Sequence, residues 1–180
     1  MNQLILRLEH VDTPLGIMLI ATDENDDLRV LDWQDETDRM HQLARLQYKG
    51  LTLNWQKTAQ ASSATQAMWR YFNGELSAIE HIKTATGGTN FQRQIWAALR
   101  SIPSGQTISY KTLAERIGNP KAVRAVGLAN GANPISIVVP CHRVIGSNKS
   151  LTGYGGGLPR KKWLLAHENA LPPETAALPL

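Results

Sequence analysis

The chain has 180 residues, of which 42% are hydrophobic and 19% charged, so it holds enough apolar material for one or two packed domains. No apolar run reaches the roughly 18 residues of a membrane-spanning helix, and the start of the chain lacks the order of a secretory signal. We therefore expect a cytoplasmic protein without a membrane partner. The single cysteine, Cys141, excludes an intrachain disulfide and a cysteine-based zinc site.

The net charge of +4 is unevenly distributed along the chain. Residues 1–90 hold 8 Lys and Arg against 12 Asp and Glu, whereas residues 91–180 hold 11 against 3, a balance of +8. A basic half of this kind favours a polyanionic partner, most commonly nucleic acid. Chance clustering on a solvated surface is the alternative.

In the N-terminal half, apolar runs predict strands at residues 4–8, 17–20 and 28–33, joined as an antiparallel meander. Helical periodicity follows near residues 40–46 and again at 64–72, with a serine available as the N-cap of the second helix. Strands followed by helices indicate an α+β arrangement. Because nothing here gathers a nucleophile, a base and an acid, we expect this half to be a scaffold.

Residues 75–90 are polar and include Gly87-Gly88, which makes them the best candidate for a linker. We expect an N-terminal domain at 1–86, a C-terminal domain at 87–170 and a flexible tail at 171–180. Beyond the linker, the apolar spacing predicts a helix over residues 91–102.

Residues 109–131 predict a pair of short helices joined by a Gly-Asn turn. Ser109 is the expected cap of the first helix, and Asn119 the cap of the second, which would start at the following proline. The second helix would leave Lys121 and Arg124 exposed. The pattern suggests a helix-turn-helix, and a plain helical hairpin is the alternative.

The apolar run 135–139 is expected to enter the core, and Pro140 stops strand pairing immediately before Cys141. A lone buried cysteine is usually inert, but His142 and Arg143 follow this one and favour a thiolate. Adjacent residues of a strand point in opposite directions. We therefore expect a turn or a bridging water between Cys141 and His142.

A carboxylate, Glu168, follows His167 at the end of a helix predicted from Leu158, Leu164 and Leu165. A surface glutamate beside a helix C-terminus is the simpler interpretation. Cysteine, histidine and acid together nevertheless make an activated nucleophile oriented by a third group. The glycines at 155–157 also imply a close backbone approach to a packed strand or a flat ligand.

Around Cys141 the sequence resembles the O6-alkylguanine-DNA alkyltransferases, also called methylated-DNA–protein-cysteine methyltransferases. The resemblance rests on NPISIVVPCHRVIG, with SYKTLAERIGNPKAVRAVG before it and GYGGGLPRKKWLLAHE after it. It is strong over residues 89–168 and weaker at TPLG, residues 13–16. It implies a ribonuclease H-like N-terminal α/β domain with an antiparallel sheet, followed by a mostly helical domain with a winged helix-turn-helix.

The family resemblance implies DNA repair by a single irreversible reaction, in which Cys141 keeps the alkyl group of O6-methylguanine after nucleotide flipping. O4-methylthymine stays open as a second substrate. The implied partner is the minor groove of double-stranded DNA, bound by a monomer that needs no cofactor and no metal. A non-catalytic module that marks alkylated DNA for other repair proteins is the alternative, and a Cys-His hydrolase is a third possibility.

The resemblance also implies individual roles. Cys141 would accept the alkyl group, His142 would take the thiol proton through a water, and Glu168 would orient His142. Asn133 would brace the site, and Tyr110 would donate towards the guanine ring as negative charge leaves.

Arg124 matches the arginine that enters the base stack and replaces the flipped nucleotide. The other residues expected at the DNA are Lys111, Asn119, Ser147 and Lys121. The guanine pocket would be lined by Val144, Tyr154, Gly155, Gly156, Gly127 and Pro140. Two positions depart from the family pattern: Lys149 stands where relatives commonly carry glycine, and Gly155 where some use serine.

Overall fold

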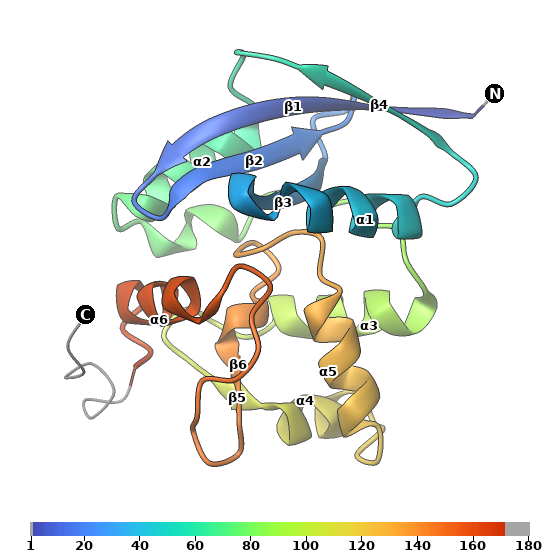
Figure 1. Cartoon of the computed structure of the whole chain (residues 1–180). Helices are drawn as coiled ribbons and strands as arrows, with labels where there is room; N and C mark the ends of the chain where they lie inside the picture. The colour runs from blue at the N-terminus through green and yellow to red at the C-terminus, as the bar shows by residue number, and fades with distance from the viewer. Residues whose placement is uncertain (1, 172–180) are drawn as a thin grey trace.

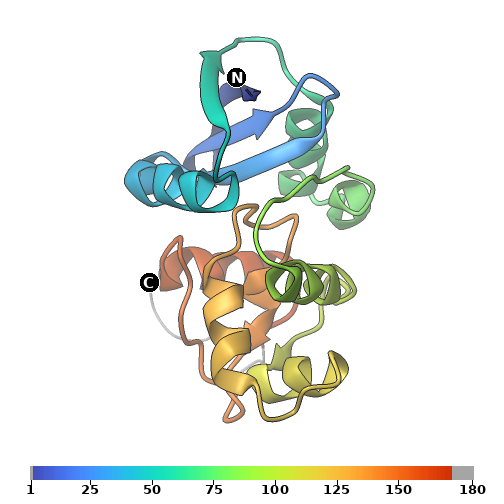
Figure 2. The ribbon, with the colours of Figure 1, turned by 90° about the vertical axis from the view of Figure 1, so that its right-hand side faces the viewer.

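The computed structural model describes residues 2–171, which contain a four-stranded sheet with flanking helices above a mainly helical part (Figures 1 and 2). The tail predicted from residue 171 lies outside the described residues, apart from Leu171 itself. Within residues 2–171 no helix is both long and apolar enough to cross a membrane.

The predicted meander is confirmed as strands β1 (Gln3–Thr13), β2 (Gly16–Thr22) and β3 (Leu28–Trp33), paired antiparallel. A further strand, β4 (Thr52–Lys57), extends the sheet to the order β3-β2-β1-β4 and runs parallel to β1. Strand β4 was not predicted from the sequence, because its apolar residues are few and do not alternate cleanly with polar ones. The sheet is therefore mixed rather than purely antiparallel.

Each face of the sheet is covered by a helix, and side chains on both faces of β2 and β3 are accordingly buried. Helix α1 (Thr37–Gln47), after the short 3-10 helix η1 (Gln34–Glu36), places Met40 in a small core with Leu19 of β2. Helix α2 (Ser63–Phe72) packs on the opposite face. Its predicted cap is confirmed, since the Ser62 hydroxyl accepts a hydrogen bond from the Thr65 N–H at 3.2 Å.

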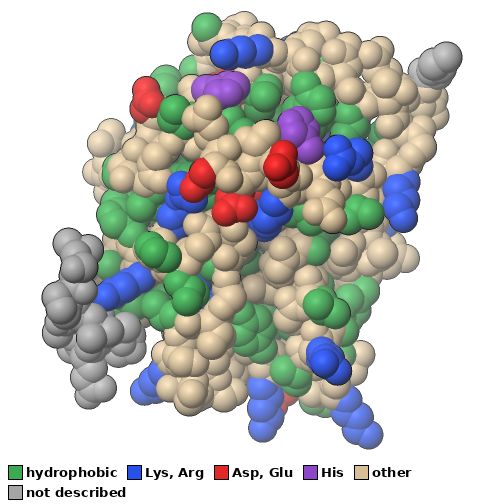
Figure 3. Space-filling view, viewed as in Figure 1, with side chains coloured by type: hydrophobic (Ala, Val, Ile, Leu, Met, Phe, Trp, Pro, Cys, Tyr) green, Lys and Arg blue, Asp and Glu red, His purple; other side chains and the backbone are tan. Residues whose placement is uncertain are grey.

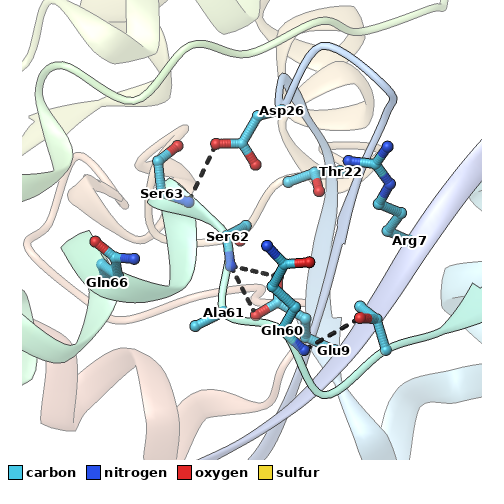
Figure 4. Close-up of a pocket in the computed structure, with 10 residues that line it drawn as sticks. Arg7, Glu9, Thr22, Asp26, Gln60, Ala61, Ser62, Ser63 and Gln66 are labelled. Atoms are coloured by element: carbon cyan, nitrogen blue, oxygen red, sulfur yellow. Dashed lines mark hydrogen bonds between the residues drawn. The ribbon is translucent and has the colours of Figure 1, made fainter.

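A polar hollow of about 320 Å³ lies where α2 begins (Figure 4). Two carboxylates in the hollow accept hydrogen bonds from the backbone at the start of α2. Glu9 accepts from the Ser62 N–H at 3.2 Å, and Asp26 accepts from the Ser63 N–H at 3.2 Å. These bonds satisfy N–H groups that a helix cannot pair internally. The hollow therefore has a structural role in anchoring the start of α2.

The polar segment expected as a linker is in contact with the sheet for part of its length. It contains the 3-10 helix η2 (Leu76–Ile79), and beyond it Lys83 and Ala85 exchange backbone hydrogen bonds with Leu28 of β3 at 2.9 Å. The domain boundary near residue 87 stays a prediction. Helix α3 (Asn90–Arg100) then begins with a capping box between Thr89 and Gln92, in agreement with the predicted helix.

The predicted helix pair is confirmed as α4 (Tyr110–Arg116), capped by Ser109, and α5 (Val123–Gly131). The predicted start of α5 was wrong. Asn119 does not cap the helix, because the chain forms a turn up to Ala122 and the helix begins at the next residue. Strands β5 (Ile108–Ser109) and β6 (Val144–Ile145) pair parallel beside the helices. The loop that follows β6 forms the wing of a winged helix-turn-helix, visible below α6 (Leu158–His167) in Figure 1.

A hydrophobic core joins the upper and lower parts of the molecule. It is made of buried side chains from β2, α2, α3, α4, α5 and α6, among them Met18, Met68, Ile95, Leu113, Val126 and Leu164. Because these side chains share one core, groups on the sheet and its helices can take part in a site built mainly by the C-terminal half.

Candidate active site

The segment before the cysteine is buried, as expected, and it is a loop that pairs with β3 through an isolated bridge at Ile135. It docks on β3 through two hydrogen bonds, from the Leu31 N–H to the Pro134 carbonyl at 3.0 Å and from the Ser136 N–H to the Leu31 carbonyl at 2.9 Å. Ile137 adopts a left-handed conformation with φ of 69°, which ends any strand there. Tertiary contact with β3 thus overrides the local β-propensity.

The buried Asn133 side chain forms hydrogen bonds to the backbone at both ends of this loop. Its side-chain N–H donates to the Val139 carbonyl at 2.7 Å, and its side-chain oxygen accepts from the Ile135 N–H at 2.9 Å. The amide therefore ties both ends of the segment that delivers Cys141, in the place where bracing is expected. Residues Cys141–Arg143 form the 3-10 turn η3, so a turn indeed separates the thiol from the imidazole.

His142 and Glu168 meet in the core although 26 positions separate them in the sequence. The imidazole Nε2 lies 3.0 Å from Glu168 Oε1, and both side chains are fully buried. The other imidazole nitrogen, Nδ1, has no hydrogen-bond partner among residues 2–171. With a proton on Nε2, Nδ1 carries a free lone pair, as a general base requires.

The position of Arg143 in the sequence predicted an interaction with the Cys141 thiol, but the side chain binds Glu168 instead. Its Nε donates to Glu168 Oε2 at 2.9 Å and its Nη2 to Oε1 at 2.9 Å, and Nη1 donates to the Ile102 carbonyl. This charge-assisted fork compensates the buried carboxylate. The prediction that Arg143 favours the thiolate is therefore wrong, because the arginine is committed to Glu168.

Burial governs the ionisation of the three groups, and neighbouring charges modify it. Burial raises the pKa of the Cys141 thiol. The Asn133 side chain and the cations Arg39 and Lys161 lower this pKa, but burial has the larger effect. Burial also lowers the pKa of His142, which Glu168 only partly offsets, so the imidazole is neutral at pH 7. Burial opposes ionisation of Glu168, but His142 and Arg143 outweigh it and hold its pKa well below the usual range.

Two cations that favour the Cys141 thiolate, Lys161 and Arg39, were not predicted from the sequence. Lys161 is fully buried and donates to the carbonyls of Val144, Thr152 and Gly153 at 2.6, 2.9 and 3.3 Å. Burial lowers its pKa to about 8, and Cys141 opposes this. Its place three and four residues before the buried Leu164 and Leu165 was the available signal, since it shares their helix face.

Arg39 comes from α1, on the other half of the chain, and pairs with Asp32 at the end of β3. Its Nη1 lies 2.5 Å from Asp32 Oδ2, and its Nη2 lies 3.5 Å from the Gly131 carbonyl. Burial raises the pKa of Asp32 to about 6, against the charge of Arg39. No local sequence pattern links this pair to the cysteine.

The glycines that follow Tyr154 pack against the N-terminal half. A Cβ on Gly155 would overlap the Arg39 guanidinium, and one on Gly156 would come within 2.7 Å of Trp33 Nε1. Arg160 lies over the Trp33 ring at 4.4 Å and bonds the Leu15 carbonyl at 3.1 Å. The expected close backbone approach is therefore to packed side chains of β3 and α1.

The other residues expected in the guanine pocket are Tyr110, Gly127, Pro140, Val144 and Tyr154. Tyr110 donates through its hydroxyl to the Thr152 carbonyl at 3.1 Å, and a Cβ on Gly127 would lie 3.9 Å from its ring. The Tyr154 hydroxyl is buried and has no hydrogen-bond partner among the described residues. Pro140 and Val144 are buried, and the Val144 carbonyl accepts from Lys161.

The residues expected at DNA lie on one exposed end of the molecule. They are Lys111, Asn119, Lys121, Arg124 and Ser147, all exposed. Figure 3 shows lysine and arginine side chains gathered along this lower edge, below α4, α5 and the wing. Lys149, in the wing, has a φ of 64°, a conformation that glycine adopts without strain.

Comparison with known proteins places these features in a family. Residues 6–86 match the family described as the ribonuclease-like domain of 6-O-methylguanine DNA methyltransferase, and residues 90–170 match its DNA-binding domain. The chain is 50% identical over 169 residues to the methylated-DNA–protein-cysteine methyltransferase of Salmonella typhimurium, covering 93% of this chain and 99% of that protein.

Solved structures agree. The fold is similar to that of Mycobacterium tuberculosis O6-methylguanine methyltransferase, with a TM-score of 0.75, 39% identity and coverage of 93% of this chain and 95% of the other. A structure of the Mycobacterium tuberculosis protein in complex with DNA gives a TM-score of 0.73 at 40% identity, covering 91% and 93%. The chain therefore belongs to the 6-O-methylguanine DNA methyltransferase family.

Proposed function

We propose that this protein repairs DNA by transferring the alkyl group from O6 of a guanine to Cys141, once per molecule. The observation that carries the proposal is the buried set Cys141, His142 and Glu168 directly behind an exposed, basic helix-turn-helix. The names of the relatives support the reaction class, because they are methylated-DNA–protein-cysteine methyltransferases.

The first step is removal of the thiol proton. His142 is neutral, and its Nδ1 has no protein partner among residues 2–171, so through a bridging water it takes the proton of Cys141. Glu168 accepts from Nε2 and stabilises the imidazolium that forms. Arg39 and Lys161 lower the cost of the thiolate in the buried site.

The second step is displacement at the alkyl carbon. The sulfur forms a bond to that carbon, the bond from carbon to O6 breaks, and its electron pair stays on the guanine. The guanine regains one proton, so the thiol proton is conserved overall and the products are a thioether and an unmodified base. A thioether has no easy leaving group, which is why we expect no turnover.

The guanine is bound by backbone groups of the loops around the cysteine. In our proposal the carbonyls of Cys141 and Val144 accept from the base, and the Gly155 N–H donates to it. The Tyr110 hydroxyl, which donates to the Thr152 carbonyl in the free protein, leaves that carbonyl and donates to the base as charge develops. Gly127, Pro140, Tyr154 and Gly156 line the same pocket, and Asn133 holds the loop that carries the cysteine.

DNA binds on the exposed end that carries α5. The nucleotide must leave the duplex, at a cost of a few kcal/mol, because the alkyl carbon is out of reach inside the stack. Arg124 fills the gap from the minor groove, whose degenerate pattern suits a protein that recognises damage. Lys111, Asn119, Lys121 and Ser147 contact the DNA backbone, the protein acts as a monomer, and its cytoplasmic location remains a prediction.

Mass spectrometry tests the proposal directly. After incubation with duplex DNA containing O6-methylguanine, the Cys141 peptide should gain one methyl group per protein, and Cys141→Ala should gain none. Binding to the same DNA without an adduct would instead support a module that only marks damage. Many product molecules from an ester or amide substrate would support a hydrolase. Repeating the measurement with O4-methylthymine decides the second substrate.

A further inference from the structure

Glu168 is held by the N-terminal half as well as by its neighbours in the C-terminal half. From the described residues it accepts four hydrogen bonds, and one of them comes from the Tyr71 hydroxyl on α2 at 2.7 Å. This bond ends on Oε1, the same oxygen that faces His142 Nε2. Tyr71 is fully buried, so the bond forms away from solvent.

The phenol is fixed relative to the end of α6 by further contacts. The Tyr71 backbone carbonyl accepts a hydrogen bond from His167 Nε2 at 2.8 Å. The Tyr71 ring packs edge to face on His167 at a centroid distance of 5.0 Å and on Phe72 at 5.4 Å. The hydroxyl therefore has little freedom to leave Glu168.

The Tyr71 hydroxyl is the third donor on Oε1, beside His142 Nε2 and Arg143 Nη2, and each donor has an electrostatic effect on that oxygen. A hydrogen bond to a carboxylate withdraws charge from the oxygen that accepts it, and so weakens the interaction of that oxygen with other donors. Without the Tyr71 hydroxyl, Oε1 would present more negative charge to His142 and would stabilise the imidazolium more strongly.

We propose that Tyr71 is a positioning residue of the alkyl-transfer site, which holds Glu168 and limits the negative charge that this carboxylate presents to His142. The inference rests on the proposed function, which it deepens by giving the N-terminal half a part in the proton transfer.

The other charged and titratable groups around His142 come from its own turn, from α6 and from the residue that caps α6. Glu168 favours the imidazolium, whereas Arg143 and Lys161 disfavour it. Cys141 is adjacent in the chain and is the proton donor in our proposal. From α2 the neighbour is a neutral phenol, since burial and the charge of Glu168 raise the pKa of Tyr71. A neutral donor can reduce the charge on Oε1 without adding a cation to the site.

The test is Tyr71→Phe, which keeps the ring and removes the hydroxyl. We expect the pKa of His142, followed by NMR of histidine-labelled protein, to rise by about half a unit to one unit. The acidic limb of the single-turnover rate with O6-methylguanine DNA should move to higher pH by the same amount. The matched control is Tyr48→Phe, because Tyr48 is also buried and donates to the Ala85 carbonyl at 3.0 Å, away from Glu168.

An unchanged His142 pKa in Tyr71→Phe, with only the loss of thermal stability that Tyr48→Phe also shows, would overturn the inference. If Tyr71→Phe does not fold, the unmodified protein provides a second measurement. A slowly exchanging Tyr71 hydroxyl proton should show a cross-peak to the His142 Nε2 proton, and its absence would count against the proposal. Both NMR measurements are independent of activity, so they remain informative even if no adduct forms on Cys141.

Discussion

Arg39 lies against Gly155 so closely that a Cβ at position 155 would overlap its guanidinium group. The same guanidinium pairs with Asp32, whose side chain is almost completely buried. A side chain at position 155 would therefore push the end of the Arg39 side chain away from its place beside Asp32. The N-terminal half reaches the candidate guanine loop through this contact.

Gly155→Ala should displace Arg39 and leave Asp32 without its partner. We expect a loss of about 1–3 kcal/mol in the free energy of unfolding, because an unpaired buried polar group is costly. Chemical denaturation checks the value. The control is Gly131→Ala, where a Cβ would meet nothing within 4 Å and little change is expected.

The coupling itself is measured by a double-mutant cycle with Arg39→Ala. In that background the overlap no longer exists, so Gly155→Ala should cost much less than in the parent protein. Equal costs in the two backgrounds would show that the two residues do not interact.

Arg39→Gln should raise the pKa of the Cys141 thiol by up to about one unit, because a nearby cation that favours the thiolate is lost. Cys141 is the only cysteine, so the pH dependence of its reaction with iodoacetamide reports this value directly. Arg39→Lys keeps the charge and should show a smaller change. A thiol pKa that is the same in all three proteins would remove Arg39 from the electrostatics of the site.

The stability of the protein should fall in acid because of Glu168. Its pKa is held below the ordinary value of 4.5 in the folded state, so its contribution is complete above about pH 4.5 and is lost as the pH falls. Glu168→Gln should cost about 3–5 kcal/mol at neutral pH by leaving Arg143 unpaired, and should flatten the acid limb. Melting temperatures from pH 3 to pH 7, roughly the range in which carboxylates titrate, check both effects.

Asp23 provides the comparison for this experiment. Burial opposes its ionisation, but its bond to Arg29 and the backbone N–H groups of Asn25 and Asp27 outweigh burial and lower its pKa too. It lies in a turn far from the reactive set, so Asp23→Asn should leave most of the acid sensitivity in place. Full acid sensitivity in Glu168→Gln would contradict the assignment to Glu168.

Arg124→Ala should slow alkyl transfer from duplex DNA by tenfold or more, on the order of the few kcal/mol that nucleotide flipping requires. Reaction with free O6-methylguanine base should be unchanged, because no stack has to be opened. Single-turnover assays with both substrates separate the two effects. Arg45→Ala, an exposed arginine on α1, is the matched control, and equal losses with duplex and free base would argue against the proposed role.

Local structural features, such as helix caps and turns, were predicted well from the sequence. The caps at Ser62 and Ser109, the helix pair and the turn at Cys141 depend on residues close together in the chain, and the structure contains each of them. The error at Asn119 is also informative. There, packing on neighbouring elements outweighed a cap signal that is worth about 1 kcal/mol.

By itself the sequence determined the reactive motif, the basic C-terminal half and the order of the helices, because these are encoded in neighbouring residues. Only the tertiary structure decided that Arg143 pairs with Glu168 and that Arg39 fills the space beside Gly155. It also brought Tyr71 to Glu168, 97 positions away. Such contacts join elements through a shared core, and no periodicity or spacing along the chain records which distant side chains that core brings together.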